Sequence, residues 1–149
     1  MKPKKSESKI QNPISVDFEY HNLNSEEKDS LIDDLKLLIE ERNEIIFSIL
    51  HGSFQTDSDF RDIDIAIYLN RPTNQDIFDY TIKFAAELEG KVRLPIDIQV
   101  LNEAPLPFRY IVADTGMVLT CRDTVFYEEF VNATTREYLD FKYFCSLYS

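Results

Sequence analysis

Cysteine and histidine are scarce in this sequence, and their positions exclude the common zinc-binding motifs. The 149 residues include two cysteines, Cys121 and Cys145, and two histidines. The cysteines form no CxxC pair and both lie far from either histidine, so no zinc-ligand spacing is present. We therefore expect two buried, unpaired thiols in a protein of a reducing compartment.

Long apolar runs and an excess of positive charge are absent as well. No run approaches the roughly 20 apolar residues of a membrane span, and no hydrophobic segment follows the N-terminal lysines. We therefore expect a cytoplasmic protein without a membrane partner. The sequence has 16 basic and 27 acidic residues, and the resulting net charge of -11 repels a nucleic-acid backbone. A direct nucleic-acid partner is not expected, whereas a protein with a basic face would be attracted.

The residues that are present predict one packed domain after a short arm. Apolar residues make up 44% of the chain, including 11 Phe and 8 Tyr, and a chain of 149 residues can fold without disulfides or a structural metal. Residues 1–24 mix Lys, Ser, Asn and Pro without a regular apolar pattern, which predicts an extended or poorly ordered arm. Residues 25–149 form the expected domain.

Apolar periodicity predicts alternating helices and strands along this domain. Asn24 and Glu27 form a capping-box pattern before apolar residues at helical spacing. The pattern predicts helices over 25–42, 72–88 (ending at Gly90), 108–114 and 123–145. Short β-branched runs predict strands over 44–50, 62–69 and 94–101. This order predicts a mixed α/β (α+β) domain in which the first two strands form a hairpin.

Two aspartates on the second predicted strand are candidates for metal binding. Asp62 and Asp64 are separated by one residue, so their carboxylates leave the same face of the strand about 6.5 to 7 Å apart. Their mutual repulsion raises a carboxyl pKa unless a cation lies between them. Magnesium prefers oxygen ligands and leaves coordination positions for water and phosphate, so this pair predicts a magnesium site.

A third carboxylate and a small-residue turn extend the candidate site. Asp97 projects from the third strand opposite the apolar row, and it would converge with Asp62 and Asp64 if the second and third strands are neighbours. Three carboxylates can hold two metals about 3.5 to 4 Å apart. Gly52 and Ser53 end the first strand, where backbone N–H groups and a hydroxyl can contact a phosphate.

Each of these features also has an ordinary structural interpretation. An Asp-x-Asp pair more often lies on a solvated face, Gly-Ser is more often only a turn, and a single aspartate is more often on the surface. Their coincidence around one hairpin favours a site. A calcium loop starting at Asp57 fails, because Asp62 occupies the position that needs glycine and Tyr68 the position that needs glutamate. Both histidines are expected to be structural.

The motifs as a set resemble those of a known family. The run HGSFQTDSDFRDIDIAIYL, residues 51–69, is similar to the Gly-Ser and Asp-x-Asp motif of minimal nucleotidyltransferases. The segment PIDIQVLNEAPLPFRYIVADTGMVL, residues 95–119, and TREYLDF, residues 135–141, resemble the MntA-like antitoxins of HEPN/MNT toxin–antitoxin systems. The loop between Ser53 and Asp62 is shorter than in most relatives and lacks their glycine, a change that surface loops tolerate.

The resemblance implies a fold, a substrate and a partner. The implied fold is the polymerase-beta nucleotidyltransferase core, a small mixed sheet flanked by helices. The implied activity is transfer of AMP from ATP, with two Mg²⁺ ions, to a tyrosine of a HEPN-family RNase toxin. By position in the motif, Gly52 and Ser53 would bind the nucleotide, Asp62 and Asp64 would bind metal, and Asp97 would be the third carboxylate.

An alternative function is an antitoxin that neutralises its partner by binding alone. The C-terminal stretch is rich in aromatic residues that could form an interface: Phe126, Tyr127, Phe130, Tyr138, Phe141, Tyr143 and Phe144. Packing of this helix on its own core is the interpretation we favour. The two functions differ in one respect, since an enzyme needs its acidic residues and a pure binding protein does not.

Overall fold

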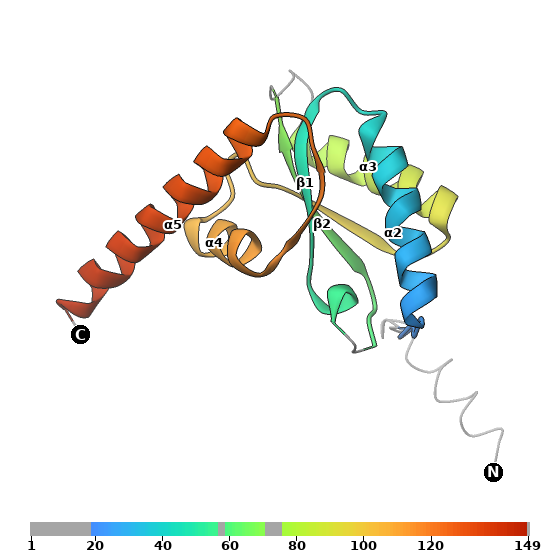
Figure 1. Ribbon diagram of the computed structural model, residues 1–149, viewed down its shortest axis with the longest axis horizontal. Coiled ribbons are helices and arrows are strands. Elements are labelled where there is room, and N and C mark those ends of the chain that lie inside the picture. The colour runs from blue at the N-terminus through green and yellow to red at the C-terminus, as the bar shows by residue number, and fades with distance from the viewer. Residues whose placement is uncertain (1–18, 57–58, 71–75, 149) are drawn as a thin grey trace, which may run out of the picture.

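The computed structural model describes residues 19–56, 59–70 and 76–148, and its centre is a four-stranded sheet in the order β3-β2-β1-β4. The strands are β1 (Ile45–His51), β2 (Ile63–Leu69), β3 (Ile96–Val100) and β4 (Met117–Cys121). The helices are α2 (Ser25–Glu40), α3 (Ile77–Val92), α4 (Leu106–Thr115) and α5 (Thr124–Ser146), with a short 3-10 turn, η1 (Ser53–Gln55). The predicted mixed α/β architecture is confirmed (Figure 1).

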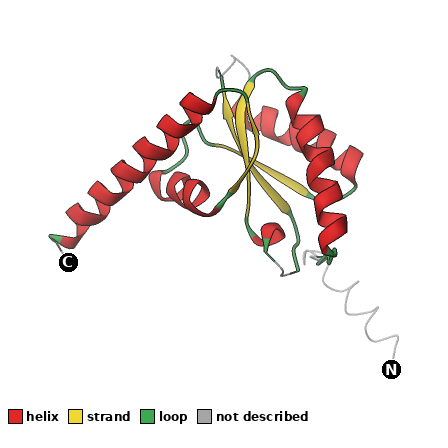
Figure 2. Ribbon diagram, in the orientation of Figure 1, coloured by secondary structure: helices red, strands yellow, loops and turns green. Residues whose placement is uncertain are grey.

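The sheet is mixed, and its topology follows the predicted order. β1 and β2 pair antiparallel as the expected hairpin, and β4 pairs antiparallel with the other edge of β1. β3 pairs parallel with β2, and the chain reaches it through the α3 crossover. Figure 2 shows the strands crossing the centre of the molecule between two groups of helices. The second and third predicted strands are therefore neighbours.

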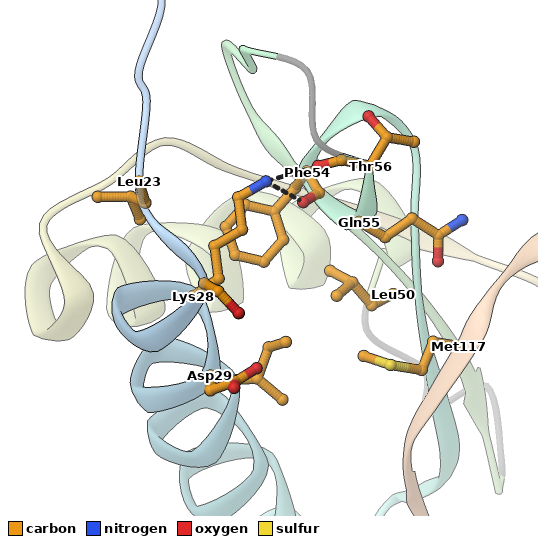
Figure 3. Close-up of a pocket in the computed structure, with 10 residues that line it drawn as sticks. Leu23, Lys28, Asp29, Leu50, Phe54, Gln55, Thr56 and Met117 are labelled. Carbon is orange, nitrogen blue, oxygen red and sulfur yellow. Dashed lines mark hydrogen bonds between the residues drawn. The ribbon is translucent and has the colours of Figure 1, made fainter.

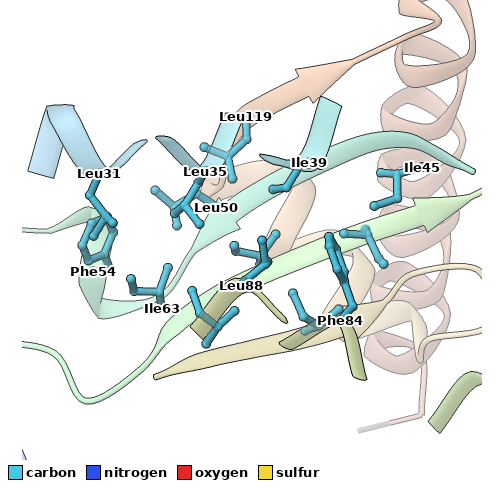
Figure 4. Packing of buried hydrophobic residues seen from close by; sticks show 14 of the residues in the cluster. Leu31, Leu35, Ile39, Ile45, Leu50, Phe54, Ile63, Phe84, Leu88 and Leu119 are labelled. Atoms are coloured by element: carbon cyan, nitrogen blue, oxygen red, sulfur yellow. The ribbon is translucent and has the colours of Figure 1, made fainter. Parts of the chain in front are cut away.

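Helices cover both faces of the sheet, and each face has its own apolar cluster. On one face, α2 and α3 pack on β1 and β2 through residues such as Leu35, Phe84 and Ile63 (Figure 4). On the other face, α4 and the first part of α5 enclose a smaller cluster around Phe47 and Val112. The strict alternation of β2 assigns its isoleucines to the first face and Asp64 to the second.

The capping box at the first helix is confirmed, and the end of α3 differs from the prediction. The Asn24 side chain accepts from the Glu27 N–H at 2.8 Å, and the Glu27 carboxylate accepts from the Asn24 N–H at 2.9 Å. α3 continues through Gly90 to Val92 and ends where Arg93 adopts a left-handed conformation, at φ 64°. Glycine inside a helix costs about 1 kcal/mol, which the packing of the last turn outweighs. The predicted start of this helix at residues 72–74 lies outside the described residues.

The two cysteines are not both buried. Cys121 in β4 is half-buried, whereas Cys145 near the end of α5 is exposed, so the expectation of a buried thiol is wrong for Cys145. The cause is the position of Cys145 on a part of α5 that extends beyond the body of the domain (Figure 1). Within the described ranges, no helix is long and apolar enough to cross a bilayer.

Candidate active site

The parallel pairing of β2 with β3 brings two of the predicted acidic residues side by side. Asp64 and Asp97 are direct register partners, and both lie on the face opposite the isoleucines. Asp64 is half-buried and Asp97 is exposed. Asp62 lies in a bend immediately before β2 and interacts electrostatically with Asp64. The fold therefore brings two of the three predicted carboxylates together, and Asp62 is related to them only through its electrostatic interaction with Asp64.

The surroundings of Asp64 disfavour the charged form of its carboxyl group. Burial is the main cause that raises the pKa of the Asp64 carboxyl above its ordinary value, and repulsion from Asp97 and Asp62 adds to it. Interactions with His51 and Gln99 act in the opposite direction. A positive charge beside Asp64 would stabilise the ionised carboxylate and so offset both its desolvation cost and its repulsion from the neighbouring aspartates.

The glycine of the predicted phosphate-binding turn lies directly against Asp64. Gly52 has φ 80°, a conformation that L side chains rarely adopt. A Cβ atom on this residue would lie 2.4 Å from Oδ2 of Asp64, far inside van der Waals contact. The preceding residue, His51, is the β1 partner of Asp64, and the exposed Ser53 follows as the first residue of η1. Gly52 therefore stands beside Asp64, and Ser53 is the next residue along the chain.

A hydrogen-bond network that was not expected from the sequence connects these groups. The Gln99 amide nitrogen donates to Oδ2 of Asp97 at 2.7 Å and to Oδ1 of Asp64 at 3.4 Å. The amide oxygen of Gln99 lies 2.8 Å from Nε2 of His51. An amide oxygen only accepts, so His51 Nε2 carries the proton and donates it. The available signal was the position of Gln99 two residues after Asp97, on the same face of the strand.

The donor set suits a hard divalent cation, although its present arrangement is not that of a metal site. Asp62, Asp64 and Asp97 offer carboxylate oxygens, which magnesium prefers, and burial of Asp64 favours a compensating charge. Among the residues that the structure describes, no three Asp, Glu, His or Cys side chains are grouped closely enough to hold a metal ion. The Gln99 amide instead bonds to two of the three carboxylates.

A separate cavity lies on the other side of the Gly-Ser turn. It has a volume of about 320 Å³ and opens between the start of α2, residues 54–56 and Met117, without contact to the acidic group (Figure 3). At its wall, Lys28 Nζ donates to the carbonyl oxygens of Phe54 at 2.8 Å and Thr56 at 2.6 Å. Lys28 thus ties the first turn of α2 to the segment that follows Ser53, a second contact not foreseen from the sequence.

Comparison with known proteins relates this fold and site to one family. The family described as polymerase beta, nucleotidyltransferase matches residues 33–125. A search of curated protein sequences gave no match. The sequence match spans β1, the Gly-Ser turn, β2 and β3, and therefore includes every predicted site residue.

Solved structures of toxin–antitoxin complexes share the fold. A tri-AMPylated Shewanella oneidensis HEPN toxin in complex with MNT antitoxin matches with a TM-score of 0.62 and 21% identity, over 77% of this chain and 89% of that one. A toxin–antitoxin structure with AMP-PNP matches at 0.62 and 22%, over 80% and 90%. The toxin–antitoxin MntA-HepT matches at 0.60 and 20%, over 76% and 89%. At these identities the likeness shows a common fold.

Proposed function

Because the chain belongs to the polymerase beta nucleotidyltransferase family, we propose that it transfers AMP from ATP to a tyrosine of a HEPN-family toxin in a reaction that requires Mg²⁺. The observation that carries the proposal is the pairing of Asp64 with Asp97 directly beside Gly52. A surface accident would not place two carboxylates and a glycine turn at one point of the sheet.

The residues divide into a nucleotide-binding group and an acidic group. Gly52 and Ser53 would hold the triphosphate, through backbone N–H groups and the Ser53 hydroxyl. Asp62, Asp64 and Asp97 would hold Mg²⁺. When bound, the cation supplies positive charge that stabilises the phosphate oxygens and the departing pyrophosphate.

The transfer itself exchanges one bond to the α-phosphorus for another. The acceptor hydroxyl oxygen forms the new bond, the bond to the β-phosphate bridging oxygen breaks, and pyrophosphate leaves. Asp97 would take the hydroxyl proton, and the support for this role is that Asp97 is the most exposed carboxylate of the group. Asp64, which is half-buried, would hold the cation and would not take the proton of the acceptor.

The solved relatives support the choice of nucleotide and partner. Among structures of the same fold, one contains a tri-AMPylated HEPN toxin with its MNT antitoxin and another contains AMP-PNP. The net charge of -11 agrees with a protein partner that carries a basic face.

The proposal predicts covalent labelling of the partner. Wild-type protein incubated with Mg²⁺, α-phosphate-labelled ATP and its HEPN partner should transfer label to the partner, and mass spectrometry should locate AMP on tyrosine. Label on the γ-phosphate should leave with pyrophosphate and give an unlabelled partner. The Asp64→Asn variant is the matched control and should transfer no label. A partner that stays unmodified while wild-type protein still neutralises it would contradict the proposal.

One observation bears on the alternative of neutralisation by binding alone. The aromatic residues of α5 divide into two groups, so the expectation of a helix packed on its own core holds only for its first part. Phe126, Tyr127 and Phe130 pack around Phe47, and Tyr138 stacks on Tyr110 at 4.0 Å between ring centroids. Beyond them, three aromatic side chains are 49%, 67% and 57% exposed: Phe141, Tyr143 and Phe144.

This exposed group lies on a part of α5 that projects beyond α4 and away from the sheet (Figure 1). An isolated helix of about ten residues is marginal in water, and a cluster of exposed aromatic side chains is typical of a binding surface. A protein partner that covers the end of α5 would serve either function, because an enzyme also has to bind its acceptor.

The double substitution Tyr143→Ser/Phe144→Ser tests this surface. We expect the affinity for the HEPN partner to fall at least about tenfold, since interface aromatic residues often contribute more than 1 kcal/mol each. The melting temperature should stay unchanged, because both side chains are exposed. Lys142→Ser, on the same segment, is the control. Unchanged affinity in a calorimetric titration would exclude the end of α5 from the interface.

A further inference from the structure

One charged side chain of α2 holds the backbone that follows the Gly-Ser turn. Nζ of Lys28 donates to the carbonyl oxygen of Phe54 at 2.8 Å and to that of Thr56 at 2.6 Å (Figure 3). Hydrogen bonds with an ionised donor are stronger than those between neutral groups. The two bonds therefore attach η1, which begins at Ser53, to the first turn of α2.

The hydrogen bonds inside η1 set the shape of the turn but not its place in the molecule. The N–H of Gln55 donates to the carbonyl oxygen of Gly52 at 3.3 Å. The N–H of Thr56 donates to that of Ser53 at 3.1 Å, so the turn closes on itself. Neither of these carbonyls is one that the ammonium group uses. The buried ring of Phe54 anchors the turn at one side chain, and contacts with neighbouring elements position the backbone after it.

Packing does not fill the space between this backbone and α2. The cavity of about 320 Å³ opens there, between the start of α2, residues 54–56 and Met117. Lys28 bonds to the backbone at the wall of this cavity, and from another side the amide of Gln55 donates to the carbonyl oxygen of Thr115 at 2.8 Å. Without its ammonium group, the backbone at residues 54–56 would have room to move.

The same ammonium group also lies over the far end of the loop that joins the turn to β2. Nζ lies 5.1 Å from the ring centroid of Phe54 and 5.6 Å from that of Phe60, and the two buried rings meet edge to face. Phe60 precedes Asp62 by two residues, and its backbone pairs with His21 just before α2, through bonds of 2.8 and 3.1 Å. The start of α2 thus contacts both flanks of the connection between Ser53 and Asp62.

We propose that Lys28 is a positioning residue for nucleotide binding, which holds the turn of Gly52 and Ser53 in place through the carbonyl groups of residues 54 and 56. The inference rests on the proposed function only in taking this turn as the triphosphate site. A turn that spends a smaller fraction of time in its binding position binds nucleotide with proportionally lower apparent affinity. In this role Lys28 bonds to the backbone and not to phosphate.

The test combines amide hydrogen exchange without nucleotide and calorimetric binding of AMP-PNP in the presence of Mg²⁺. Lys28→Met keeps the apolar part of the side chain and removes the ammonium group. Exchange at residues 54–56 should become about tenfold faster, the scale of one hydrogen bond to a charged group, and the affinity for AMP-PNP should fall by about the same factor. Lys28→Arg, which keeps the charge and the donors, should recover most of both. Lys36→Met, about two turns further along the same helix, is the matched control and should change neither.

The two readouts are compared at a temperature at which every variant is folded. Faster exchange with unchanged affinity for AMP-PNP would make Lys28 merely structural, and lower affinity with unchanged exchange would make it a direct contact to phosphate. Either result overturns the inference, as does a Lys28→Arg variant that behaves like Lys28→Met. Wild-type protein that binds AMP-PNP but does not label its partner would contradict the proposed function and leave this inference standing.

Discussion

Gly52→Ala is expected to reduce AMP transfer about 100-fold while the protein still folds. The added Cβ would lie 2.4 Å from Oδ2 of Asp64, so the carboxylate has to move, and displacement of a reacting group by about 1 Å costs on this order. Alanine is also disfavoured at φ 80°, so the substitution should lower the free energy of unfolding by about 1–3 kcal/mol. Transfer kinetics and denaturant unfolding measure the two effects.

Gly90→Ala is the matched control for this substitution. Gly90 lies inside α3, and nothing lies within 4 Å of a Cβ added there. Alanine at this position should stabilise the protein by about 0.5–1 kcal/mol and leave transfer unchanged. Normal transfer by folded Gly52→Ala protein would mean that the close approach of Gly52 to Asp64 has no part in the chemistry.

The sequence contained enough to predict the fold and the meeting of the acidic residues. The alternation around Ile63 and Ile65 assigned Asp64 to the opposite face, and the hairpin followed from the short connection between the first two strands. The adjacency of Asp64 and Asp97 needed one further step, that the crossover through α3 returns beside β2, and the parallel pairing confirms it. The roles of Gly52, Ser53 and the three aspartates in binding stay predictions.

Other features depend on register and tertiary packing, which periodicity does not encode. Gln99 looked like any polar residue of a strand until the pairing of β1, β2 and β3 brought it to His51 and Asp64. The exposed end of α5 is as rich in aromatic residues as its start, but only the start packs on the cluster around Phe47. The end of α3 was misplaced because glycine is a weak helix terminator when the next turn packs.

Asp97→Asn is the substitution that best separates a reacting carboxylate from a structural one. A carboxylate that accepts a proton in the transition state contributes about 100- to 10,000-fold, so AMP transfer should fall within that range. ATP binding should largely persist, because Asp62 and Asp64 remain to hold the nucleotide-side cation. A single-turnover assay with a parallel nucleotide titration measures transfer and binding independently. Normal transfer would mean that the site works with two carboxylates.

The stability of Asp97→Asn should not fall, and the reason lies in the pKa of Asp64. Because folding raises this pKa, the folded protein binds that proton more tightly than the unfolded chain, and stability declines as the pH rises through the raised value. Removing the charge of Asp97 removes one cause of the shift, while the amide oxygen of the substituted side chain can still accept from Gln99. Without Mg²⁺, the variant should therefore be at least as stable as wild type above that pH, with the advantage shrinking as the pH is lowered. Unfolding of the variant under these conditions would instead assign Asp97 a structural role in the sheet.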